Sequence, residues 1–86
     1  MPIISEFYGI TVRRFYNDHA PPHFHAEYGE YELIISISPI VIMQGKAPNR
    51  VKSMILEWSA LHQAELLNNW HRCRQAQSIE KIEPLE

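Results

Sequence analysis

Three of the five histidines of this 86-residue chain lie in one segment, "DHAPPHFHAEYGEYE", which runs from Asp18 to Glu32. His23 and His25 are two residues apart, so on a β-strand both imidazoles project from the same face. Imidazoles at that spacing can share one metal ion, and either one can act as a general base. The segment is therefore the first candidate site.

A metal site is one hypothesis for this segment. Glu27 continues the histidine row, and Asp18 or His19 can return over it from the preceding turn. Such a mixture of imidazole and carboxylate ligands suits a divalent transition metal such as zinc, nickel, iron or manganese better than calcium. The sequence fixes no third ligand, so the expected set is His23, His25, Glu27 and His19.

Catalysis by the same histidines is a second hypothesis. His23 or His25 acts as general base while Arg14 steadies a phosphate, as a small metal-independent ribonuclease requires. A metal-dependent hydrolase is a related alternative. If the helical half of the chain meets the polar face of the sheet, His62 becomes a second base or a third ligand. No nucleophile motif or glycine-rich phosphate loop accompanies these residues.

A structural role for the segment is the third hypothesis. Gly29 begins a two-residue loop between strand-like runs, which predicts a type II′ hairpin turn and places Glu27 directly opposite Glu32. Like charges in that position are unfavourable unless a cation neutralises them. Arg13 or Arg14 can do so, as can a metal, a protonated histidine or a cationic partner. If an arginine does so, the pair is structural.

Strand-type residues dominate the first half of the chain and predict an antiparallel meander of three or four strands over about residues 3–43. Residues 3–8 either extend the first strand through a bulge or form a separate edge strand. Alternation assigns one face of the predicted hairpin to the core, with Phe24, Ala26, Tyr28, Tyr31, Leu33, Ile35 and Ile37. The histidines lie on the opposite, polar face.

The second half is predicted to be helical over about residues 48–76, since Pro48 suits a first helical turn. Its apolar residues form two stripes that are rotated relative to each other: Val51, Met54, Ile55, Trp58 and Leu61, then Leu66, Leu67, Trp70 and Cys73. We therefore expect two helices or one bent helix that packs on the sheet, with the change near residues 59–63. A continuous helix that uses the second stripe to bind a dimer partner is the competing interpretation.

Residues 78–86 form a short tail that we expect to lie over the core, and the chain is expected to be one α+β domain spanning residues 1–86. Its net charge of −2 gives no basic field that would attract nucleic acid non-specifically. A single cysteine excludes an internal disulfide framework and a cysteine zinc cluster. With no signal peptide and no apolar run of about 18 residues, a cytoplasmic location is expected.

A family resemblance is carried by "FYGITVRRFYNDHAPPHFHAEYGEYE", "GKAPNR", "EWSALHQAELLNNW" and "KIEPL". Over nearly its whole length the chain resembles small bacterial proteins of domain of unknown function 4160. The resemblance implies no defined activity, but such proteins resemble components of toxin–antitoxin or regulatory gene pairs, often encoded beside another small domain. It also draws attention to His62 beside His23 and His25.

Small size and the lack of a catalytic motif favour a module that binds a small protein partner or forms a homodimer. A toxin–antitoxin-like or regulatory pair is the role that the resemblance implies for it. A histidine-dependent ribonuclease, a metal-dependent hydrolase and a metal-binding module are the alternatives. Nucleic acid remains a further candidate partner.

Overall fold

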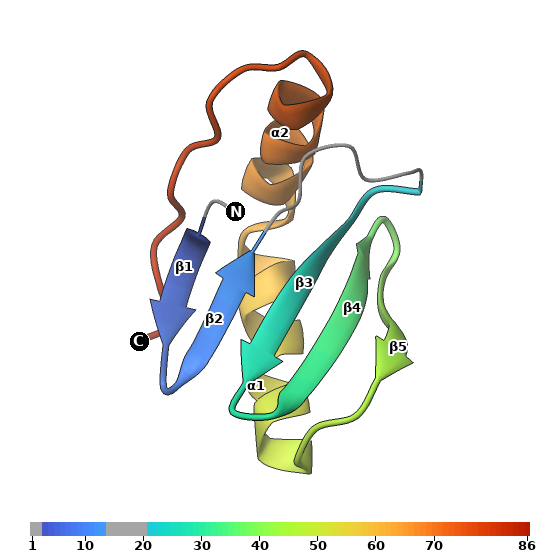
Figure 1. Ribbon diagram of the computed structural model, residues 1–86, viewed down its shortest axis with the longest axis vertical. Coiled ribbons are helices and arrows are strands. Elements are labelled where there is room, and N and C mark those ends of the chain that lie inside the picture. Colours follow the sequence, from blue (N-terminus) through green and yellow to red (C-terminus); the bar gives the residue numbers. More distant parts are fainter. Residues whose placement is uncertain (1–2, 14–20) are drawn as a thin grey trace.

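The computed structural model describes residues 3–13 and 21–86. Its sheet contains five antiparallel strands that follow one another in chain order, as Figure 1 shows. These strands are β1 (Ile3–Phe7), β2 (Ile10–Arg13), β3 (His23–Tyr28), β4 (Tyr31–Ile37) and β5 (Ile40–Gly45). The α+β class and the meander predicted from the sequence are confirmed.

The number of strands is five because residues 3–7 form a separate edge strand. Tyr8 and Gly9 have positive φ angles of 49° and 82°, and this backbone conformation closes a tight hairpin between β1 and β2. Sequence patterns had left open a bulged extension of β2 at this point. A bulge does occur, but within β1, where the register with β2 shifts between Ile3 and Ser5.

The hairpin of β3 and β4 has the predicted register. Tyr28 pairs with Tyr31, and Glu27 pairs with Glu32. Gly29 has a φ of 58°, as the first central residue of a type II′ turn requires. The turn therefore sets which side chains of β3 point toward the core, and Phe24 and Ala26 are buried there.

Two helices follow the sheet on one side of it, and in Figure 1 the first lies behind the strands while most of the second extends beyond their ends. They are α1 (Asn49–Leu61) and α2 (Gln63–Arg74), and His62 separates them with φ −120° and ψ 25°. No helix within the described residues is long and apolar enough to cross a membrane. The sequence alternatives are thus resolved as two helices.

Both apolar stripes of the helical half pack inside the chain. Leu66, Trp70 and Cys73 of the second stripe are buried, as are Val51 and Trp58 of the first. The interpretation of the second stripe as a dimer-binding surface is therefore wrong. On one straight helix the second stripe would point away from the first. Because the helix is interrupted at His62, the second stripe can face the same core as the first.

Leu61 departs from the expected core position, because 67% of this residue is exposed. It is the last residue of α1, and the chain turns immediately afterwards. Its place on the helical wheel agrees with the first stripe, but no described element extends far enough to cover it. The structure thus leaves a large apolar side chain at the helix junction.

The tail after α2 runs back along β1 (Figure 1). The backbone N–H of Ile82 donates a hydrogen bond of 3.0 Å to the carbonyl oxygen of Ile4, and the Ile82 side chain is buried in the core. The indole Nε1–H of Trp58 donates to the carbonyl oxygen of Glu83 at 2.8 Å. The expectation that the tail lies over the core is confirmed.

Candidate functional site

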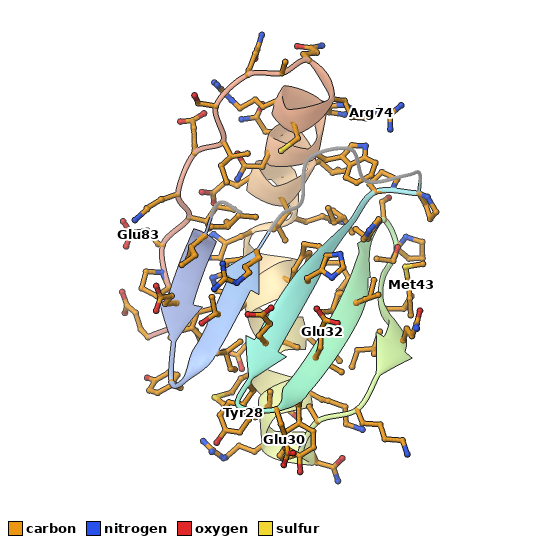
Figure 2. All side chains as sticks on the ribbon, in the orientation of Figure 1. Tyr28, Glu30, Glu32, Met43, Arg74 and Glu83 are labelled. Carbon is orange, nitrogen blue, oxygen red and sulfur yellow. The ribbon has the colours of Figure 1, made fainter. Side chains whose placement is uncertain are left out.

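The sheet face opposite the helices carries the residues that the sequence singled out. We call it the histidine face; among its members are Thr11, Arg13, His23, His25, Glu27 and Glu32. Figure 2 shows the sheet from this side, with Glu32 labelled. Adjacent strands hold these side chains in fixed register, so the geometry follows directly from β2, β3 and β4.

Arg13 binds Glu27 across the β2–β3 pair. Its Nε donates a hydrogen bond of 2.9 Å to Oε1 of Glu27, and both side chains are partly exposed. The direct strand partner of Arg13 is His25, so the ion pair runs diagonally. One of the cations proposed from the sequence thus neutralises one of the two opposed glutamates.

Glu32 has a different basic neighbour. Nδ1 of His25 lies 3.5 Å from Oε2 of Glu32, which is ion-pair range for a protonated imidazole. Only 14% of the His25 side chain is exposed, and both of its ring nitrogens are buried. A metal or substrate therefore reaches these nitrogens only after surrounding groups move, which limits His25 as a general base.

His23 is placed at the start of β3, where the chain leaves the Pro21-Pro22 pair. Its Nδ1 is 2.8 Å from the carbonyl oxygen of Pro21. A carbonyl only accepts, so Nδ1 carries the proton and the lone pair of the neutral ring is on Nε2. The ring centroid lies 5.4 Å from that of His25 and 5.4 Å from that of Trp70. The predicted adjacency of the two histidines is present.

The metal hypothesis has only part of its ligand set on the described residues. Within residues 3–13 and 21–86, no group of three or more His, Cys, Asp or Glu side chains is placed to hold a metal ion. Glu27 is engaged by Arg13, and His19 lies outside the described residues. The set stays a prediction, which elemental analysis of protein made without a histidine tag tests directly.

The catalytic hypothesis has a similar gap. Arg14, the proposed phosphate-binding residue, lies outside the described residues. His62 lies within the described residues and interacts with Glu65 and Trp58. Its Nδ1 donates a hydrogen bond of 2.7 Å to Oε1 of Glu65, and its ring centroid lies 5.5 Å from that of Trp58. Among described residues, His62 therefore makes no hydrogen bond, ion pair or ring contact with His23 or His25.

His62 instead borders a groove of about 290 Å³ between the end of α1 and the tail. We call this feature the junction groove, and its lining residues are Glu57, Leu61, His62, Glu83, Pro84, Leu85 and Glu86. Three of these residues are glutamates and none is lysine or arginine. Figure 2 labels Glu83 of the tail at the left of the view and Arg74 at the upper right. The groove lining thus combines apolar and acidic side chains.

The tail that forms one wall of the groove is held by polar contacts to both helices. Asn69 of α2 brackets the backbone of Glu80: its Nδ2 donates to the carbonyl oxygen at 2.7 Å, and its Oδ1 accepts from the N–H at 2.8 Å. The Glu80 carboxylate also lies 2.9 Å from Nη2 of Arg72. These contacts and the Trp58–Glu83 bond fix the tail against both helices.

The sequence patterns do not predict this groove. The tail residues that form one wall of it carry no recognisable motif. The groove depends on contacts between residues that are more than ten positions apart, such as Trp58 with Glu83. The one available signal was Leu61, whose stripe position coincides with the predicted helix break.

Comparison with known proteins identifies a family, but the description of that family names no activity. The family model for the domain of unknown function DUF4160 matches residues 9–71, which includes every strand except β1 and nearly all of both helices. No curated protein and no solved structure matches the chain. The protein belongs to the DUF4160 family.

Proposed function

We propose that the protein is a partner-binding component of a toxin–antitoxin-like or regulatory pair, and that the junction groove receives a segment of the partner protein. The observation that carries the proposal is Leu61. With 67% of its surface exposed, it exceeds the other exposed large apolar residues of the described chain, and it lies within a concave surface. An exposed apolar side chain in a groove is a typical protein-binding feature.

The chemistry of the groove defines what it binds. Burial of a leucine side chain contributes about 1.5–3 kcal/mol, so Leu61 can serve as the centre of a small hot spot. Glu57, Glu83 and Glu86 line the same groove and give it negative charge. A segment with an apolar residue flanked by lysine or arginine therefore fits, and the charges accelerate its association.

The groove is preformed, which favours binding. Asn69 and Trp58 hold the tail through hydrogen bonds that are already made in the free protein. A partner segment then does not have to order that wall, and the entropic cost of association falls accordingly.

The experiment is co-expression with any small protein whose gene adjoins that of this chain, followed by affinity measurement on the purified pair. Leu61→Asp and Glu83→Lys are expected to weaken binding by about tenfold or more. Tyr8→Asp and Glu30→Lys are the matched controls, because both positions are exposed, lie in hairpin turns and are not among the residues that line the groove. Unchanged binding by Leu61→Asp, or isolation of a lone monomer that binds no neighbour, contradicts the proposal.

A histidine-dependent ribonuclease is the second candidate function. It is favoured by the 5.4 Å separation of the His23 and His25 rings, with Arg13 on the same face. Its test is growth after induced expression of the wild type and of a His23→Ala, His25→Ala double variant, with folding checked by circular dichroism. Arrest by the wild type and relief in the folded double variant support the nuclease. Absence of arrest by the wild type counts against it.

A further inference from the structure

The two edges of the sheet differ in how they are covered. β1 forms one edge, and the tail lies along it with the Ile82–Ile4 hydrogen bond. β5 forms the other edge, and no described segment pairs with its outer side. Figure 1 shows the tail beside β1 and no element beyond β5. Alternate backbone N–H and C=O groups of an uncovered edge strand point outward and can pair with another strand.

The side chains of β5 do not protect this edge. Val41 and Met43 are each 48% exposed. The stretch between Glu32 and Lys46, "LIISISPIVIMQG", contains no charged residue, and its single proline precedes β5. Soluble proteins usually protect an edge strand with a central charge, a proline, a β-bulge or a covering segment, and among the described residues β5 has only a bulge at Met43. The register irregularity opposite Ile34 and Ile35 leaves Ile40–Ile42 as a regular stretch of edge.

We infer that β5 pairs antiparallel with β5 of a second copy of this chain, which joins the two five-stranded sheets into one continuous sheet. A two-fold axis pairs the strand with the same strand of the other copy, so a charge at the axis, or two like charges at paired positions, would repel. β5 is neutral along its whole length and carries no such repulsion. A second copy is therefore an occupant that the composition of the strand suits.

The covered β1 edge determines the size of the assembly. Pairing of β5 with β1 of another copy would be a head-to-tail contact, which produces a larger ring or an open fibre. The tail along β1 opposes this arrangement, whereas a β5–β5 contact closes after two copies. A dimer also suits a domain of this size, because small domains bury a smaller fraction of their surface. The contact uses none of the groove residues, so the inference goes beyond the proposed function.

The test is the molar mass of the purified full chain across a concentration series, measured by light scattering and sedimentation. The wild type is expected to be a dimer that dissociates on dilution. The Val41→Lys, Met43→Lys double variant is expected to be a monomer with the circular dichroism of the wild type. A Tyr8→Lys, Leu61→Lys double variant adds the same charge at exposed apolar positions elsewhere and should remain dimeric.

A Val41→Thr, Met43→Gln double variant controls for misfolding of the lysine variant, because it removes apolar surface without adding charge. It should dissociate at higher concentration than the wild type. A wild-type monomer at about 100 µM, or a β5 lysine variant that stays dimeric, overturns the inference. A monomer that still binds the neighbouring protein overturns the dimer alone, whereas a dimer that binds no neighbour overturns only the proposed function.

Discussion

Glu27 and Glu32 face each other across β3 and β4, and each carboxylate lies beside a different basic side chain. Arg13 is 2.9 Å from Glu27, and His25 is 3.5 Å from Glu32. Directly opposed like charges destabilise a strand pair. Arg13 is always charged, so on the histidine face it offsets the repulsion that this register creates between the two glutamates.

Replacement of Arg13 by alanine should destabilise the protein by about 0.5–1 kcal/mol, since it leaves the two glutamates opposed in a partly exposed setting. Urea unfolding measures the change. In a Glu32→Gln background the same replacement should cost less, because the repulsion is already removed. An equal cost in both backgrounds would show that Arg13 stabilises the sheet through other contacts.

Gly45 should be far less replaceable than Gly29. Gly45 has a φ of 106°, and a Cβ there would collide with the carbonyl oxygen of Glu32 and lie 3.1 Å from Cα of Leu33. Both obstacles are backbone atoms, so Gly45→Ala is expected to cost about 2–4 kcal/mol. At Gly29 a Cβ meets nothing within 4 Å, and only the positive φ is unfavourable, which costs about 1 kcal/mol. Similar melting temperatures for the two variants would contradict this.

Local patterns predicted the hairpin of β3 and β4 down to its register. Gly29 fixes the turn, the turn fixes the pairing of Glu27 with Glu32, and alternation then assigns each side chain to a face. The two helices were also foreseeable, since a straight rod cannot bury two rotated stripes against one sheet. In both cases the deciding information is local in the sequence: a turn of two residues for the hairpin, and the spacing of apolar residues over 51–73 for the helices.

Tertiary contacts decided what local patterns left open. Tyr8 adopts a positive φ that is unusual for a bulky residue, and this separates β1 from β2. Leu61 belongs to an apolar stripe but ends its helix without a cover, and the tail finds its place through Asn69 and Trp58. These contacts join residues that are far apart in the chain and leave no periodic pattern, so the junction groove could not be predicted from the sequence.

His23 offers a way to separate a structural role from a catalytic one. His23→Asn retains an N–H donor near the position of Nδ1, which can still bind the Pro21 carbonyl oxygen, but it removes the base at Nε2. We expect its stability to lie within about 0.5 kcal/mol of the wild type, while His23→Ala loses about 1 kcal/mol. Under the leading proposal, His23→Asn binds the partner as the wild type does. A folded His23→Asn that relieves growth arrest would favour the nuclease.

Asn69 should control both the tail and the groove, whereas its neighbour Asn68 should not. Asn69 is buried and makes two hydrogen bonds to the Glu80 backbone, and Asn68 is exposed with one contact of 3.4 Å to the Glu80 side chain. Asn69→Ala is expected to cost about 1–3 kcal/mol, and Asn68→Ala less than about 0.5 kcal/mol.

The release of the tail has its own readout, because the exposed Lys81 lies one residue beyond Glu80. Asn69→Ala should speed tryptic cleavage after Lys81 under native conditions, since local opening of the tail then costs less free energy. The same variant should weaken partner binding, because one wall of the junction groove becomes mobile. Rapid cleavage without weaker binding would place the partner elsewhere than the groove. Unchanged cleavage would show that Trp58 and Ile82 hold the tail without Asn69.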